Sequence, residues 1–294
     1  MINYNGRKSN ISIRRLIEGF ALGLVTLLFL NQFLGVSAQP DLDSDGIPDS
    51  VEKELALKYL PYLQFKAGER FFPVDVTYHL NNSVLKLRLG EDVLTVDTSP
   101  TVDAISGRDE NYFLDNGLGG FKEIAEDYRQ RKGSLGYTVY ARVTKESGYV
   151  VVQYWFFYAY NDVALNQHEG DWEMVEIILD ETGNPVLAVY SQHLQGQRTA
   201  WHNVEKVDGT HPKVYVARGS HANYFRPYQG RLGLERDEVS ADGPLITPSD
   251  VKLVILGEMG VGNHPASQDW LEFRGRWGDW ARLADAAAGL AGPY

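Results

Sequence analysis

The stretch YVVVQYWFFYAYNDVALNQHEGDWEMVEIIL, residues 149–179, decides the fold class of this chain. Its first half is apolar or aromatic at nearly every position, which is typical of a strand buried on both faces. From Asp171 onward, the acids alternate with apolar residues. In a second strand Asp171 and Glu173 would point to one face and Trp172 and Met174 to the other. We therefore predict a central strand followed by a strand that carries a polar end.

Further strands are predicted on both sides of this stretch. GYTVYARV and YVVVQYWFFYAY form one hairpin across KESG, and DWEMVEIIL and PVLAVYSQH form another across DETGN. Three more strands are predicted at Ser83–Leu89, 213–219 and 250–256, whereas residues 97–119 have the composition of a long loop. Helical signals are limited to a short segment after Asp49 and to residues 120–133. The strand count predicts a mainly β chain, a β-sandwich of the lectin or cytolysin type with a few short helices.

Residues 1–38 have the features of a secretory signal peptide. A basic front precedes an apolar run at 20–35, and small residues at 36–38 suit a cleavage site. An uncleaved N-terminal anchor is the alternative, although the run is short for a membrane span and is interrupted by Asn31 and Gln32. We therefore expect a signal at 1–38, a calcium loop with a short helix at 39–60 and a β-sandwich at 61–294. Export predicts a secreted or periplasmic location, with no transmembrane span after cleavage.

Charge and cysteine content restrict the partners. The whole chain carries −11 and residues 1–38 carry +3, so the remainder carries −14. Such acidity disfavours nucleic acid, which attracts basic surfaces. The chain has no cysteine, so any metal ligands must be oxygen atoms or imidazoles, which suit calcium, magnesium, manganese or zinc.

The segment DLDSDGIPDSVE, residues 41–52, follows the spacing of a calcium-binding loop. Alternate acids can converge on one cation, a glycine permits the sharp turn, and the Ile47 carbonyl can add a ligand. The predicted calcium ligands are Asp41, Asp43, Asp45, Ile47, Asp49 and Glu52. An acidic linker without metal is the alternative. After the predicted cleavage only residues 39 and 40 would precede the loop, too few for an entering helix. We therefore expect a single structural loop similar to those of thrombospondin-type and dockerin-type proteins.

A second cation site is predicted at the polar end of the strand. In an extended strand Asp171 and Glu173 share a face, and His168 lies across the Gly170 turn. Asp162, at the end of the preceding strand, can supply a further carboxylate. These four residues form a workable ligand set for a divalent cation, with calcium or magnesium expected. A polar hairpin end without metal is the alternative interpretation.

Six blocks give the chain a family resemblance. LALKYLPYLQFKAGERFFPVDVTYHL, VVVQYWFFYAYND, HEGDWEMVEI, PVLAVYSQH, HPKVYVARGSHANYF and WLEFRGRWGD occur in that order, from about Leu55 to about Gly278. Together they resemble the vacuolar protein sorting-associated protein sixty-two family. HEGDWE and GSHANYF are the most specific blocks. The resemblance implies little mechanism, because a role in vacuolar sorting does not follow for an exported protein.

HEGDWE is also similar to the heptapeptide GHRHDWE of the necrosis- and ethylene-inducing-like (NPP1-type) cytolysins. This distant similarity implies a secreted β-sandwich in which His168, Asp171 and Glu173 help to hold a divalent cation, with Asp162 as the upstream partner. The chain departs from that motif at Gly170, where the cytolysins have a second histidine, and in its shorter spacing back to Asp162.

Two further histidines are candidate ligand-binding residues. His221 follows a glycine turn in RGSHANYF, and His193 ends the strand AVYSQH. Either can approach the same polar end as a ligand or as a hydrogen-bonding neighbour of one. A structural, hydrogen-bonded histidine is the alternative for each.

We therefore expect an exported, cation-dependent binding protein that recognises a glycan or a lipid headgroup. A metal-dependent hydrolase with Glu169 or His221 as its base is one alternative, and a membrane-damaging effector is another. Neither a GxSxG elbow nor a helical HExxH is present in the sequence, so a binding role is favoured over catalysis.

Overall fold

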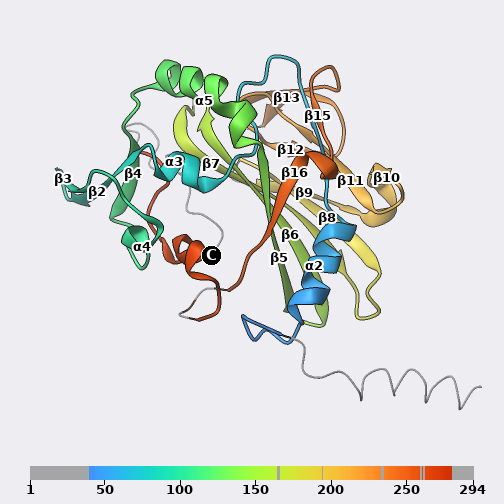
Figure 1. Cartoon of the computed structure of the whole chain (residues 1–294). Helices are drawn as coiled ribbons and strands as arrows, with labels where there is room; N and C mark the ends of the chain where they lie inside the picture. The colour runs from blue at the N-terminus through green and yellow to red at the C-terminus, as the bar shows by residue number, and fades with distance from the viewer. Residues whose placement is uncertain are drawn as a thin grey trace, which may run out of the picture. The chain divides into compact units, whose positions relative to one another are not determined.

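The computed structural model describes residues 40–163, 166–193, 195–232, 235–258, 260 and 262–279. The described residues from 41 to 279 belong to one compact unit, whose elements are shown in Figure 1. The predicted signal at 1–38 lies outside the described residues.

A six-stranded sheet contains the stretch that decides the fold. Its strand order is β16-β5-β6-β7-β8-β9. The strands are β5 (Tyr137–Glu146), β6 (Tyr149–Asn161), β7 (His168–Leu179), β8 (Pro185–Gln192), β9 (Gln195–Ala200) and β16 (Val251–Ile255). Both predicted hairpins are confirmed, and β6 is an interior strand as its apolar sequence predicts. Strand β16 is also confirmed and runs parallel to β5.

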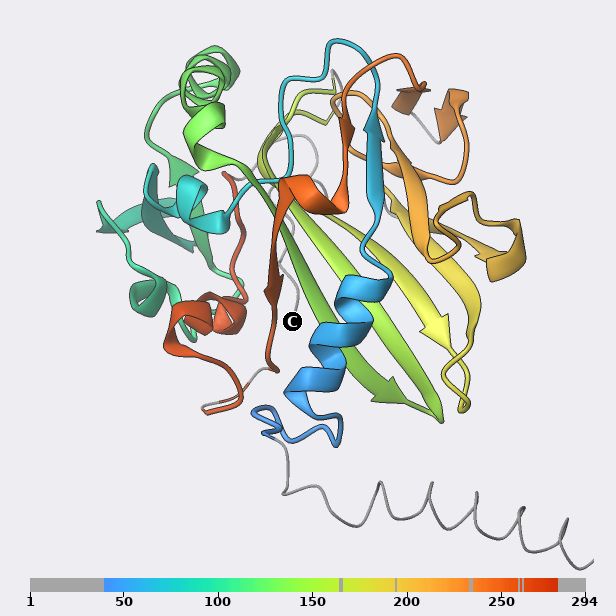
Figure 2. The same cartoon turned by 45° about the vertical axis from the view of Figure 1, so that its right-hand side comes forward.

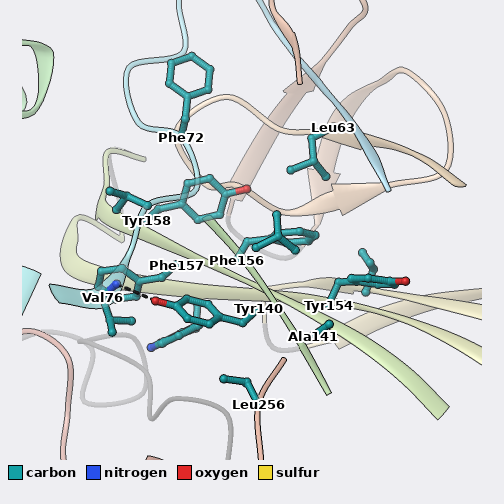
Figure 3. Close-up of a cluster of buried hydrophobic side chains, with 14 of the residues drawn as sticks. Leu63, Phe72, Val76, Tyr140, Ala141, Tyr154, Phe156, Phe157, Tyr158 and Leu256 are labelled. Carbon is teal, nitrogen blue, oxygen red and sulfur yellow. Dashed lines mark hydrogen bonds between the residues drawn. The ribbon is translucent and has the colours of Figure 1, made fainter. Parts of the chain in front are cut away.

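A second sheet packs on one face of the first. It contains β1 (Tyr62–Phe65), β10 (Lys206–Val207), β11 (His211–Val216), β12 (Asn223–Tyr224) and β15 (Leu245–Ile246). Side chains of both sheets share one buried cluster, which includes Leu63 and Val214 from this sheet and Phe156 and Val175 from the other. Figure 3 shows Leu63 and Phe156 among the buried side chains of this core. The predicted mainly β sandwich is therefore confirmed.

The other face of the six-stranded sheet is covered by aromatic side chains. Trp172 of β7 lies among Phe157, Trp270 and Trp277, with ring centroids 5.0 to 5.8 Å away. Trp270 belongs to the 3-10 helix η3 (Ala266–Glu272), and α3 (Val76–Leu80) also packs here. The Tyr140 hydroxyl accepts the backbone N–H of Val76 at 2.9 Å, the dashed line in Figure 3. Because side chains alternate along β7, Asp171 and Glu173 lie on the opposite face from Trp172, the face towards the second sheet.

Two smaller sheets complete the β structure. A hairpin is formed by β13 (Tyr228–Leu232) and β14 (Glu235–Val239). A three-stranded sheet has the order β3-β2-β4, with β2 (Ser83–Leu89), β3 (Asp92–Asp97) and β4 (Tyr112–Asn116). The prediction of a loop at 97–119 is wrong, because α4 (Val102–Ile105) and β4 lie within it. Phe113 and Leu114 are buried there, an apolar pair too short to stand out in a polar segment.

The helices lie around the sheets (Figures 1 and 2). Helix α2 (Asp49–Lys58) packs against the six-stranded sheet, where the Tyr154 hydroxyl donates to the Ala56 carbonyl at 2.8 Å. Helix α5 (Phe121–Leu135) buries Ile124 and Tyr128 on the face that its spacing predicts. Two short 3-10 turns are η1 (Trp201–Asn203) and η2 (Pro248–Asp250). Both predicted helices are confirmed.

Candidate functional site

The acidic loop at 41–52 forms a group of side chains that could hold a metal ion. Ligand oxygens of Asp41, Asp43 and Asp45 lie within 4.8 Å of one another. Gly46 has φ +91 at the turn, a backbone conformation that glycine adopts without strain. Asp49 accepts the backbone N–H of Leu42 at 2.8 Å and so closes the loop.

Electrostatics in this loop favour a bound cation. Glu52, in the first turn of α2, is buried, and one of its oxygens has no hydrogen-bond partner. Burial and the four nearby aspartates raise the pKa of Glu52 to about 8. Burial and Asp45 raise the pKa of Asp43 to about 6. A hard cation bound by oxygen ligands would offset both the burial of these carboxylates and the repulsion between them.

Gly170 sets the geometry of the second candidate site, at the start of β7. It has φ +59, and an added Cβ would overlap the carbonyl oxygen of Trp277. Across this turn, His168 Nε2 lies 3.7 Å from Asp171 Oδ1. Asp171 and Glu173 pair with Tyr158 and Phe156 of β6, so both carboxylates lie on the face towards the second sheet.

His221 lies between two carboxylates. Its Nδ1 is 2.7 Å from Asp171 Oδ2, and its Nε2 is 3.6 Å from Glu69 Oε1. The ring stacks on Tyr158 with centroids 3.8 Å apart. Burial lowers the pKa of His221, but Glu69 and Asp171 outweigh it and raise the pKa to about 10. A charged imidazolium is therefore buried at the centre of the site.

Glu69 is a member of this site that the sequence analysis missed. It accepts backbone N–H groups of Arg70, Phe71 and Gly219 at 2.7 to 2.9 Å. Burial raises the pKa of Glu69, but His221 and these donors lower it overall below the usual value. Glu69 lies in the turn after β1, and only the sandwich brings it to His221, so no local spacing indicates it.

Glu173 is buried beside Asp171 and accepts a hydrogen bond from the Ser191 hydroxyl. Burial and the carboxylate of Asp171 raise the pKa of Glu173 well above its usual range. A cation bound beside Glu173 would stabilise its charged form and relieve this cost of burial. We call these five residues the acid–imidazole cluster: Glu69, His168, Asp171, Glu173 and His221.

Asp162 lies at the rim of the cluster and is already paired. Its Oδ2 is 2.9 Å from a guanidinium nitrogen of Arg70, whose side chain is 57% exposed. Gly219, with φ +80, separates Asp162 from Glu69, and a Cβ there would overlap an Asp162 oxygen. The structure thus places Asp162 close to the cluster but holds it in a surface ion pair.

His193 belongs to a neighbouring network. Its Nε2 lies 2.8 Å from Asp237 Oδ2, and Asp237 also accepts hydrogen bonds from Ser220 and Tyr224. Asp237 is buried in β14, so this network fastens the β13–β14 hairpin beside the cluster. His193 is therefore near the predicted site but does not join its carboxylates.

Glu169 is turned away from the cluster. Its carboxylate accepts the backbone N–H of Asn116 at 2.8 Å, and burial raises its pKa to about 8. The hydrogen bond with Asn116 holds this orientation. It removes Glu169 from the position that a catalytic base at His168 and Asp171 would need.

The two sites differ in how closely their ligands gather. In the described part of the chain, Asp41, Asp43 and Asp45 are the only group of three acidic or imidazole side chains whose ligand atoms all lie within 4.8 Å. His168, Asp171 and Glu173 do not meet that distance as a set. For one cation to bind all three, their ligand atoms would have to move closer together.

Comparison with known proteins places this arrangement in a family. The family described as Vacuolar protein sorting-associated protein 62 matches residues 38–284. The chain belongs to this family. The match covers the acidic loop, both sheets and the acid–imidazole cluster, and it confirms the predicted resemblance.

Two curated yeast relatives each share 24% sequence identity with this chain. The protein TDA6 of Saccharomyces cerevisiae, named for vacuolar protein sorting, is 24% identical over 76% of this chain. The chain spans about three fifths of the length of the curated yeast relatives it matches. Their whole-protein activities therefore do not transfer directly to this Vps62-family chain.

Similar solved structures include proteins of the necrosis- and ethylene-inducing type. "NLPPya in complex with mannosamine" is 19% identical, covers 87% of this chain and 88% of its own, and has a TM-score of 0.42. Necrosis and Ethylene inducing Protein 2, from the causal agent of cocoa's Witches Broom disease, is 14% identical over 80% of this chain and 83% of its own, with a TM-score of 0.39. No helix among the described residues is long and apolar enough to cross a membrane.

Proposed function

We propose that this Vps62-family protein is a divalent-cation-dependent binding protein. Calcium would occupy the acidic loop, and a second divalent cation, calcium or magnesium, would occupy the acid–imidazole cluster. The ligand would offer paired oxygen atoms, as sugar hydroxyls or as a lipid headgroup.

The observation that carries this proposal is an imbalance of buried charge. Glu69, Asp171 and Glu173 are three carboxylates in a nearly dry site. One imidazolium, His221, lies between the first two. Glu173 must then keep a proton or accept a cation, because an unpaired buried carboxylate is costly. Oxygen atoms and an imidazole form a donor set suited to a hard or borderline divalent ion.

The rim of the cluster supplies a contact for a ligand. Arg70 stacks its guanidinium 5.1 Å from the Phe121 ring centroid and pairs with Asp162. Planar guanidinium donors suit pairs of oxygen atoms on sugars or phosphates. An oxygen-bearing ligand that engages Arg70 would compete with Asp162, which would then be available to the cation.

The acidic loop is proposed as a structural clamp. Ile47 of the loop is buried in the main core, and α2 follows directly. Bound calcium would therefore fix the start of α2 against the six-stranded sheet. This role is distinct from ligand recognition, since the loop and the cluster share no residue.

Elemental analysis of the purified full chain tests the cation sites. We expect two divalent ions per chain in the native protein and one in Asp171→Asn. The matched control is Glu176→Gln, an acid of the same strand that bonds Gln153 at 2.9 Å and should keep both ions. A native protein without stoichiometric metal would overturn the proposal.

Ligand assays separate the candidate functions. Retention on a glycan array that is lost with EDTA and in Asp171→Asn would identify a glycan ligand, and cation-dependent binding to phospholipid vesicles would identify a headgroup. Metal-dependent turnover of generic phosphoesters or esters would indicate a hydrolase instead. Release of dye from vesicles would indicate a membrane-damaging effector.

Export is part of the proposal. The predicted signal at 1–38 and the acidic remainder suit a secreted or periplasmic protein. Mass determination of the protein from its native host provides the test, with a mature N-terminus near residue 39 expected.

A further inference from the structure

Strand β3 is an uncovered edge of the three-stranded sheet. Among the described residues it pairs only with β2, through the register Leu87↔Leu94 and Arg88↔Val93. Residues 92–96 are all exposed, and Figure 1 shows β3 as the outermost strand of its sheet. Its outer backbone groups can therefore accept another strand.

The exposed residues of this edge are mainly apolar. Val93, Leu94 and Val96 of β3 are 51%, 50% and 42% exposed, and Leu89 at the end of β2 is 53% exposed. Natural edge strands commonly carry lysine or proline, which block further pairing. The segment from Asp92 to Asp97 contains neither residue. A cluster of exposed apolar side chains on an edge strand is typical of an interaction surface.

Charge at the two ends of β3 selects the partner. Glu91 and Asp92 precede the apolar residues, and Asp97 follows them. A second copy of β3 would place acid against acid at both ends, in either orientation, which is unfavourable. The acidic tip also disfavours insertion into an anionic membrane. Basic residues on both sides of an apolar strand would complement this edge.

We propose that β3 is a docking edge for an extended segment of a partner protein, with an apolar centre flanked by lysine or arginine. The segment would add a strand beside β3, so that backbone hydrogen bonds supply affinity and the flanking charges supply specificity. This interaction is separate from the cation sites and from their proposed ligand.

A pair of labelled peptides tests the proposal. One peptide alternates valine and threonine between two lysines at each end, and the other has glutamates in place of the lysines. Fluorescence anisotropy with the full chain should show binding of the lysine peptide at least tenfold tighter than that of the glutamate peptide. Leu94→Lys should weaken the lysine peptide by at least tenfold.

Two controls keep the test decisive. Leu57→Lys changes a leucine of nearly equal exposure on α2, 48% against 50%, and should leave binding unchanged. Asp92→Lys combined with Asp97→Lys should reverse the preference between the two peptides. Equal binding of both peptides, or no binding, would overturn the proposal.

Two other outcomes would assign the edge to a different occupant. A dimer of the native chain that Leu94→Lys converts to a monomer would identify a second copy. Vesicle binding that Leu94→Lys abolishes, without peptide binding, would identify a lipid surface. Either result contradicts a basic peptide partner.

Discussion

The acidic loop and the acid–imidazole cluster differ in how much of their negative charge the protein itself neutralises. In the loop, Asp43 and Glu52 lie among other acids, and their pKa values are raised to about 6 and 8. In the cluster, Asp171 bonds His221 at 2.7 Å and Glu173 bonds Ser191. Neutralising the loop would therefore require an external cation, whereas the cluster is already partly neutralised by the protein.

This difference predicts different responses to the loss of a partner. Removing an acid from the loop relieves repulsion when no metal is present. Removing the imidazolium from the cluster leaves two buried carboxylates unpaired, which is among the most destabilising changes in a protein interior. The following substitutions separate these two regimes, from the largest expected effect to the smallest.

His221→Asn should give the largest effect. Asparagine tolerates the left-handed backbone that His221 adopts at φ +57, so the change chiefly removes the charged ring. We expect a loss of about 4 kcal/mol in the free energy of unfolding, from breaking a buried charge pair. Urea denaturation at pH 7 measures it. His202→Asn, on an exposed turn, should be neutral, and a loss below about 1 kcal/mol in His221→Asn would show that the cluster is not neutralised by this ring.

Both regions contain acids, so their effects on stability can be compared by measuring unfolding at different pH values. His79 also makes the free energy of unfolding depend on pH, and its contribution must be measured first. This ring is buried beside Phe157 and Trp277, and burial lowers its pKa from 6.5 to about 4. The unfolded chain therefore binds the extra proton between these pH values, and stability is lost as the pH falls from 6.5 to 4. The slope approaches 1.4 kcal/mol per pH unit, or about 3 kcal/mol in total.

Unfolding of His79→Gln across the same pH range measures this contribution. Its stability should vary less with pH than that of the native chain. His202→Gln should retain the native slope. An unchanged slope in His79→Gln would assign the acid sensitivity to another group.

Calcium bound at the acidic loop should stabilise the protein. At a hundredfold excess over its dissociation constant, a ligand adds about 2.7 kcal/mol to the free energy of unfolding. Glu52→Gln should lose this gain, yet it should be no less stable than the native chain in EGTA, because it removes a buried acid from four aspartates. Glu54→Gln, an exposed acid of the same helix, should keep the calcium response. Thermal unfolding with calcium or EGTA provides the comparison.

Local pattern explains why the grouping of Asp41, Asp43 and Asp45 could be predicted from the sequence. The acids of the loop occur within residues 41–52, and the turn at Gly46 brings three of them together without help from the rest of the fold. The apolar run of β6 likewise predicted an interior strand. Where spacing within one segment determines which residues come together, the sequence is sufficient to predict the arrangement.

The cluster was predicted only in part, because one of its five residues and several neighbouring contacts come from distant segments. HEGDWE indicated His168, Asp171 and Glu173, and GSHANYF indicated His221. Glu69 and the Asp237 network depend on packing between sheets, and the ion pair of Asp162 with Arg70 joins residues 92 positions apart. No spacing within a segment reports such contacts, nor did it report the short strand β4.

Arg70→Gln should give the smallest effect on stability and the clearest evidence on Asp162. The pair is a surface ion pair with an exposed guanidinium, so its loss should change the free energy of unfolding by less than about 1 kcal/mol. Lys252→Gln, which breaks the surface pair with Asp75, is the matched control for stability. If Asp162 is a ligand of the second cation, its release from Arg70 should tighten manganese binding several-fold, measured by titration calorimetry, whereas Lys252→Gln should not. Unchanged manganese affinity in Arg70→Gln would restrict the second site to the buried cluster, and a loss of affinity would show that Arg70 holds Asp162 in the position that the cation requires.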